Sequence, residues 1–362
     1  MYINAAREWL KSAFSLNEYY LTPKDERALR YDKTTWIANR IFNKTFRKAQ
    51  VHPEARADIL KKVKQSIENG LPLHFIACFG GYKHFWNPSY PEVDFAELFN
   101  LRFMSEYISP ILKAHAPGVV LEYESEDVIL TTMDNYPQDD LDRYSQSFRK
   151  LIDLYSKTLP ANMKINLIRA REQVPADALW KKIDDFLPNI RAEWASLSKE
   201  EIELRLSHAP SNIMWKGAED LTGLSAEEKR RRILESKIIN EAYYAADWEF
   251  RKDFFTGENH IPLVFWFGKT RDNFGHWLTL GSTHSSMVDF WVGRGILEMR
   301  NGKAVERIVS HSQYDMIKGK LETVEAFNGL PLKNFKYIEV GGDLGIGEAQ
   351  KRNADQPAPQ KA

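Results

Sequence analysis

The chain has 362 residues, 43% of them hydrophobic and 12% aromatic, enough to fill one large domain or two ordinary ones. Its 50 basic and 50 acidic residues cancel, so no overall charge favours nucleic acid or an anionic membrane surface. The N-terminal residues mix both signs of charge, and no apolar run is long enough to cross a bilayer. These features favour a cytoplasmic protein, and its single cysteine, Cys78, excludes an internal disulfide.

Residues 1–70 have a helical pattern, and we expect them to form helices that cover the rest of the domain. Apolar residues recur at helical spacing over Arg27–Ala49 and again over Pro53–Asn69, after which Gly70 is a stop signal. The sequence therefore predicts two helices before the first strand.

From Leu73 the pattern alternates between strand and helix. We predict strands over Leu73–Phe79, Val119–Tyr123 and Met163–Ile168, separated by helices over Asp94–His115 and from Asp140 onwards. Alternation of this kind is typical of parallel βαβ units. The expected fold class is α/β, with a Rossmann-like, mostly parallel sheet that carries helices on both faces.

The remaining segments complete a domain that we assign to residues 71–342. Residues 175–255 return to a helical pattern and form an insertion in this domain. Beyond Asn259 short apolar runs reappear, with a hairpin signal at Asn301-Gly302, and these strands are expected to extend the first sheet. The polar residues of 343–362 predict a disordered tail.

A glycine turn follows the first predicted strand. Gly80 and Gly81 would let backbone N–H groups approach an anion, and Tyr82 and Lys83 come directly after them. A partly desolvated lysine can hold a phosphate or condense with a carbonyl group. The spacing fits neither Gly-x-Gly-x-x-Gly nor the P-loop, which argues against a nucleotide site, and a plain turn is the alternative for the glycines.

Acidic residues crowd the end of the second predicted strand. Strand alternation would turn Glu122, Glu124 and Glu126 to one face, with Asp127 next in the chain. Carboxylates so close raise one another's pKa, which suits acid–base catalysis or recognition of an amine. An exposed edge strand or a loop is the alternative.

The C-terminal β region contains His276, His284 and Arg294, with hydroxyl side chains on both sides of His284. A loop of this kind can supply a general base or bind phosphate. The histidines lack the spacing of a helical zinc pair, and with one cysteine in the chain we expect no metal site. A structural role for each histidine is the alternative.

Several segments between residues 73 and 155 follow one known pattern. They are a lysine-bearing turn after a strand, Pro91–Leu98, a helix closed by Pro117-Gly118, and Ser125-Glu126-Asp127, followed by Leu141–Tyr144 on a helix. This pattern resembles the N-terminal half of the pyoverdine/dityrosine biosynthesis family, the isocyanide synthases. The chain has Ser-Glu-Asp where that family has Ser-Asp-Gly.

The resemblance implies conversion of the α-amino group of an amino acid, often tyrosine or tryptophan, to an isonitrile. Ribulose 5-phosphate would supply the carbon, without a metal or redox cofactor. On this hypothesis Lys83 holds the phosphate or the ketose carbonyl, Glu126 and Asp127 bind the substrate ammonium, and a histidine moves protons. The resulting catalytic set is Lys83, Glu126, Asp127 and His284, and the substrate-binding set is Gly80, Gly81, Tyr82, Ser125, His276 and Arg294.

Two other interpretations stay open at the level of the sequence. The first is a different Rossmann-like transferase that acts on an aminoacyl or nucleotide substrate, with Tyr243, Tyr244 and Glu249 lining its pocket. The second is a non-catalytic ligand-binding relative that keeps the sheet. The expected partners of the enzyme are small molecules, an amino acid and a sugar phosphate, and not nucleic acid or a membrane.

Overall fold

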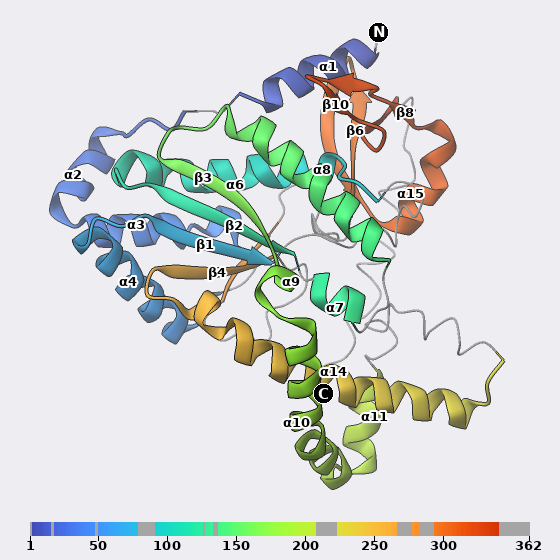
Figure 1. The fold of residues 1–362 in the computed structure, drawn as a ribbon. Coiled ribbons are helices and arrows are strands. Elements are labelled where there is room, and N and C mark those ends of the chain that lie inside the picture. Colours follow the sequence, from blue (N-terminus) through green and yellow to red (C-terminus); the bar gives the residue numbers. More distant parts are fainter. Residues whose placement is uncertain are drawn as a thin grey trace.

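The centre of the protein is a five-stranded parallel sheet in the order β3-β2-β1-β4-β5 (Figure 1). The computed structural model describes residues 2–15, 18–47, 50–78, 91–125, 127–132, 137–207, 223–265, 277–281 and 293–339. The strands are β1 (Leu73–Cys78), β2 (Val119–Ser125), β3 (Met163–Arg169), β4 (His260–Phe265) and β5 (Leu278–Leu280). This order matches that of doubly wound dinucleotide-binding sheets, so the predicted Rossmann-like α/β class is confirmed.

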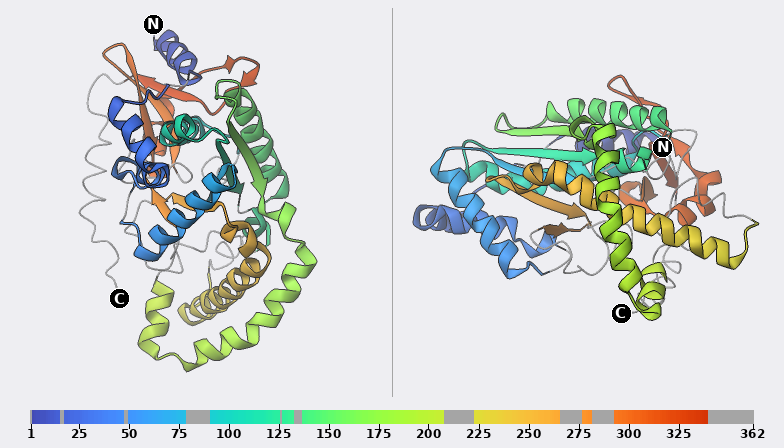
Figure 2. Two further views of the ribbon diagram at one scale, coloured as in Figure 1. Left: turned by 90° about the vertical axis from the view of Figure 1, so that its left-hand side faces the viewer. Right: turned by 60° about the horizontal axis from the view of Figure 1, so that its bottom comes forward.

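Helices cover both faces of this sheet (Figure 2). α6 (Phe95–Ala114) and α8 (Gln138–Ser156) lie on the face to which Tyr123 of β2 points, since Tyr123 contacts Asn100 and Phe148. α4 (Pro53–Glu68) and α14 (Ala226–Thr256) lie on the other face, beside β4. The strand order reverses between β1 and β4, and sheets of this type bind ligands at the carboxyl ends of their strands near such a reversal.

Capping residues fix both ends of α6, which agrees closely with the predicted helix. Asp94 accepts a hydrogen bond from the N–H of Ala96 at 2.7 Å, and Glu97 accepts one from the N–H of Asp94 at 2.8 Å. His115 is the C-cap, and Gly118 then adopts φ +81°, which only glycine adopts readily. The turn leads directly into β2.

The N-terminal region is helical as predicted, but it contains more helices than the two that were predicted. The sequence predicted one helix over Arg27–Ala49, but the chain breaks at Asp32, whose side chain accepts a hydrogen bond from the N–H of Thr35 at 2.9 Å. Aspartate is a better N-cap than helix-interior residue, so capping outweighs the helical pattern here. The elements are α1 (Tyr2–Ala13), α2 (Pro23–Tyr31), α3 (Lys33–Ile41), η1 (Lys44–Phe46) and α4.

Asp25 anchors α2 to α3, and we expect this anchor to weaken in acid. Burial alone would raise the pKa of Asp25, but hydrogen bonds from Thr22 and Trp36 and the charge of Arg40 outweigh it and hold that pKa well below its usual range. The unfolded chain therefore binds a proton more readily than the folded protein, so the stabilisation is present above about pH 4 and is lost as the pH falls further.

Urea unfolding at several pH values tests this expectation. Asp25→Asn should lower the free energy of unfolding by about 1–3 kcal/mol at pH 7, and the difference from the unmodified protein should shrink below about pH 4. A difference that stays constant with pH would show that the charge of Asp25 has no part in the anchor.

The segment between β3 and β4 is helical where it is described. Its elements are α9 (Ala170–Gln173), α10 (Ala176–Ser196), α11 (Lys199–Ser207) and α14. Ser198 and Glu201 form reciprocal capping contacts at the start of α11, at 2.8 and 3.2 Å. Ser225 accepts from the N–H of Glu228 at 3.1 Å, while the Glu228 carboxylate pairs with Arg231 instead.

A second sheet packs against α1 and α6 (Figure 1), and this corrects the expected single sheet. Of the described strands beyond Asn259, β4 and β5 join the first sheet. Four later strands form a second sheet in the order β7-β6-β11-β8, and β9 and β10 pair in a small two-stranded sheet. Asn301 and Gly302 have positive φ angles, so the predicted hairpin is confirmed and it pairs β6 with β7. The elements are β6 (Arg294–Arg300), β7 (Lys303–Val309), α15 (His311–Ile317), η3 (Lys318–Lys320), β8 (Glu322–Thr323), β9 (Ala326–Phe327), β10 (Leu330–Pro331) and β11 (Lys336–Glu339). The predicted tail, 343–362, lies outside the described residues.

Candidate active site

Polar side chains gather where β2 and β3 end. The last residues of these strands, Ser125 and Arg169, are register partners, so their side chains project from the same face of the sheet. This is the face covered by α8, and α7 (Asp127–Thr132) begins two residues after β2. The carboxyl ends of β2 and β3 therefore bring Ser125, Asp127 and Arg169 to the edge at which doubly wound sheets bind ligands.

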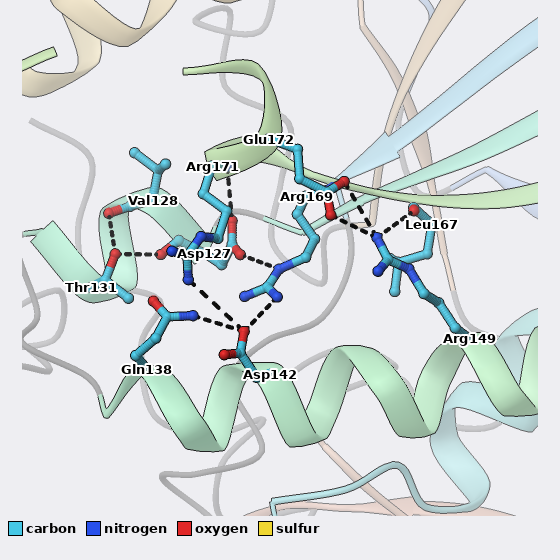
Figure 3. A network of polar contacts seen from close by, with 10 residues as sticks. All are labelled: Asp127, Val128, Thr131, Gln138, Asp142, Arg149, Leu167, Arg169, Arg171 and Glu172. Atoms are coloured by element: carbon cyan, nitrogen blue, oxygen red, sulfur yellow. Dashed lines mark hydrogen bonds and ion pairs between the residues drawn. The ribbon is translucent and has the colours of Figure 1, made fainter. Parts of the chain in front are cut away.

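Arg169 is held between two carboxylates (Figure 3). Its Nε donates to Asp127 at 2.6 Å, and its Nη1 donates to Asp142 of α8 at 2.5 Å. Asp127 also accepts from the backbone N–H of Arg171 at 3.1 Å, and Asp142 accepts from Gln138 at 2.8 Å. A planar guanidinium with two fixed contacts has little rotational freedom, so the orientation of Arg169 is set by three segments of chain.

Burial and nearby positive charge shift the pKa values of Asp127 and Asp142 in opposite directions. Burial raises the pKa of Asp127 above its ordinary value, although hydrogen bonds from Arg171 and Arg169 oppose the shift. Burial would also raise the pKa of Asp142, but hydrogen bonds from Arg169 and Gln138 outweigh it and lower that pKa. Arg171 lies 3.9 Å from Asp142, so two cationic and two anionic side chains balance in this network.

Two polar atoms of the site have no hydrogen-bond partner among the described residues. They are Oγ of Ser125 and Nη2 of Arg169, both shielded from solvent. Ser125 is 1% exposed and Arg169 is 8% exposed. Because buried polar groups are nearly always hydrogen-bonded, two such atoms on adjacent strand ends indicate a place where a ligand can supply the missing partner.

A second buried charge network lies on the opposite face of β2. Glu124 precedes Ser125, so its side chain points to α14, where it pairs with Arg251. Arg251 also donates from Nε to Asp247 at 2.8 Å, and all three side chains are buried. Glu122 lies on the same face, 4.0 Å from Nδ1 of His74. Since β2 lies between β1 and β3, the alternative of an exposed edge strand is wrong for these two glutamates.

Arg294 begins β6 in the second sheet. Its Nε lies 3.9 Å from Asp94, the N-cap of α6, and its guanidinium lies 3.6 Å above the ring centre of Tyr314. The N–H of Gly295 donates to Asp94 at 3.0 Å, so the start of β6 is attached to the start of α6. α6 starts on the side of the sheet where β1 ends, which places Arg294 toward the carboxyl edge.

The chain shares the fold of PvcA from Pseudomonas aeruginosa. The two structures superpose with a TM-score of 0.53 at 14% sequence identity, covering 85% of this chain and 100% of PvcA. No family model matches the sequence, and no curated protein matches it either. At this level of identity the likeness to PvcA shows a common fold alone.

Within the PvcA-like fold, the predicted site residues fall into three groups. Ser125 and Asp127 lie together at the carboxyl end of β2, and Arg294 lies in the second sheet. The other predicted residues lie outside the described part of the chain: Gly80, Gly81, Tyr82, Lys83, Glu126, His276 and His284.

The sequence interpretation missed Arg169, Asp142 and Arg251. One signal for Arg169 was present, because an arginine directly follows the predicted strand Met163–Ile168, at the edge where ligands bind. Asp142 lies within the segment Leu141–Tyr144 that carries part of the family resemblance, but nothing there indicated its contact with Arg169. Arg251 carries no local signal, since it is one charged residue among many on a long helix.

The described residues contain neither a membrane-spanning helix nor a cluster of metal-binding side chains. None of the described helices is long and apolar enough to span a bilayer. No group of three or more histidine, cysteine, aspartate or glutamate side chains is arranged to hold a metal ion in the described ranges.

Proposed function

We propose that this protein is a biosynthetic enzyme of the isonitrile synthase type. It would convert the amino group of an amino acid to an isonitrile, with ribulose 5-phosphate as the carbon donor. The observation that carries the proposal is the position of Ser125 and Asp127. These two residues belong to one of the segments that carry the family resemblance. They lie at the carboxyl end of β2, and Ser125 has a buried hydroxyl group without a partner among the described residues.

The fold agrees with this proposal. PvcA is a pyoverdine-cluster protein of the isonitrile synthase type, and the present chain covers its full length. The motif resemblance over residues 73–155 supports this class of enzyme, and the fold shared with PvcA over most of the chain is compatible with it.

The reaction begins with a carbon–nitrogen bond. The amine nitrogen attacks the ketone carbon of ribulose 5-phosphate, a proton passes from nitrogen to oxygen, and water leaves to give an imine. Such a step needs a charged group for the phosphate, an orienting group for the ketone and a proton carrier. We assign the phosphate to Lys83 or Arg294, the ammonium to Glu126 and the proton transfers to His284 or His276.

The structure suggests a different role for Asp127 from the one that the resemblance implies. Both of its carboxylate oxygens accept hydrogen bonds, one from Arg169 and one from the N–H of Arg171. We therefore propose that Asp127 acts by fixing the position of Arg169, while Glu126 binds the substrate ammonium.

A direct assay tests the proposed function. Purified protein is incubated with single amino acids and uniformly ¹³C-labelled ribulose 5-phosphate, and the products are analysed by mass spectrometry. We expect a product that has gained one labelled carbon and lost the two hydrogens of the amine. If no aromatic or aliphatic amino acid is consumed, the proposal is wrong. Stabilisation by a nucleotide or aminoacyl analogue, and not by the sugar phosphate, would then favour another transferase.

Lys83→Ala separates an enzyme from a non-catalytic relative. Because a lysine that holds the ketose acts directly on the reaction, we expect turnover to fall about 100-fold with little change in melting temperature. Lys64→Ala is the matched control, since Lys64 is an exposed residue of α4 that faces Glu68 across one helical turn. Equal activity of the two variants would remove Lys83 from the mechanism.

A further inference from the structure

Ser125 and Arg169 combine three properties that together indicate a binding subsite. They end neighbouring parallel strands in register, their side chains share one face, and each has a buried polar atom without a partner among the described residues. Leaving a buried hydrogen-bonding group unsatisfied costs about 1–3 kcal/mol, so a fold keeps such groups where something else satisfies them.

The charge balance of the network indicates what this subsite binds. Arg169 already contacts Asp127 and Asp142, and Arg171 lies near Asp142, so the cationic charge is neutralised within the protein. A phosphate or carboxylate placed against this balanced network would bring an uncompensated negative charge into a buried site. An uncharged oxygen accepts a hydrogen bond from Nη2 without that cost.

Two side chains of the network are partly exposed to solvent. Arg169 is 8% exposed, but the side chains of Asp142 and Arg171 next to it are 39% and 41% exposed. Figure 3 shows both of these side chains on the same side of Arg169, beside the N-terminal part of α8. Exposed side chains of the network therefore adjoin the buried guanidinium of Arg169.

We propose that Ser125 Oγ and Arg169 Nη2 form a subsite for an uncharged oxygen, a hydroxyl or ketone group, of a polyhydroxylated substrate. Ser125 can donate or accept, and Nη2 donates, which matches adjacent hydroxyl and carbonyl groups of a keto sugar. The choice of a keto sugar rests on the proposed function. In that setting the subsite orients the sugar, and its phosphate is bound elsewhere.

Ser125→Ala tests the subsite without disturbing the charge network. Calorimetric titration with ribulose 5-phosphate should give a Kd about 3–10-fold higher than that of the unmodified protein, the loss expected for one hydrogen bond. Titration with inorganic phosphate should give an unchanged Kd. The melting temperature should not fall, because the substitution removes a buried hydroxyl group that has no partner among the described residues.

Ser66→Ala is the matched control. Ser66 of α4 is also fully buried with an unpartnered Oγ, but it lies on a helix away from the strand ends. Its replacement should leave both Kd values unchanged. Arg169→Lys, which keeps the charge and loses Nη2, should weaken sugar binding like Ser125→Ala.

The possible outcomes separate this inference from the proposed function. Unchanged sugar affinity in Ser125→Ala would overturn the subsite, even if the protein forms an isonitrile. A parallel loss of phosphate affinity would show that the subsite binds an anion and would also overturn it. No binding of ribulose 5-phosphate by the unmodified protein would exclude the keto sugar. Sugar binding that depends on Ser125 without isonitrile formation would support the subsite and reject the proposed reaction.

Discussion

Replacing Arg251 by methionine is expected to lower the free energy of unfolding by about 3–5 kcal/mol. Arg251 is buried between Glu124 of β2 and Asp247 of α14, and both carboxylates are buried with it. Methionine fills much of the volume but removes the cation, which leaves two like charges close together in a poorly solvated place. Urea unfolding followed by circular dichroism measures the loss.

Arg231→Met on the same helix is the control for this expectation. Arg231 pairs with Glu228 across one helical turn, and its side chain is 68% exposed. Exposed ion pairs contribute about 0–1 kcal/mol, so this variant should unfold almost like the unmodified protein. If the two variants were equally stable, the network of Glu124, Arg251 and Asp247 would be no stronger than a surface pair.

Arg251→Met should also affect the candidate active site. Glu124 directly precedes Ser125, so a shift of Glu124 toward water moves the strand end that carries the candidate subsite. At temperatures where Arg251→Met is still folded, we therefore expect its affinity for ribulose 5-phosphate to be lower as well. This coupling would give a functional reason for the ion pair that joins α14 to β2, two elements that are far apart in the sequence.

Local patterns were enough to predict the first half of the sheet. The apolar runs of β1, β2 and β3 and the helical spacing of α6 and α8 are signals that each segment carries by itself. The predicted start of this helix, at Asp94, lies within one residue of the start of α6 at Phe95. These segments form the scaffold on which Ser125 and Asp127 are positioned.

Pairings between distant segments could not be predicted in the same way. Arg169 is 42 residues from Asp127, and Arg251 is 127 residues from Glu124. The residues around an arginine do not predict which carboxylate it pairs with, because the pairing depends on strand order and on the packing of helices. The separation of the later strands from the first sheet was missed for the same reason, since short apolar strands do not reveal which neighbour they join.

Gly295→Ala is expected to separate the second sheet from α6. A Cβ atom at this position would lie 2.0 Å from the backbone nitrogen of Ala96 and 2.4 Å from the carbonyl carbon of Phe95. Backbone atoms cannot rotate away as a side chain can, so β6 must move off the helix. The hydrogen bond from Gly295 to Asp94 would be lost with the shift. We expect the free energy of unfolding to fall by about 3–5 kcal/mol, measured by urea unfolding.

Gly319→Ala distinguishes this contact from the general effect of adding a methyl group. Gly319 lies in η3 close to the same sheet, and a Cβ atom there would have no atom within 4 Å. Its replacement should be neutral or stabilise the protein by up to about 1 kcal/mol, because alanine restricts the unfolded chain.

If Arg294 binds substrate as predicted, Gly295→Ala should also reduce turnover, since Arg294 is held by the same junction with Asp94. Full activity in a destabilised Gly295→Ala protein would remove Arg294 from the active site and confine the second sheet to a structural role.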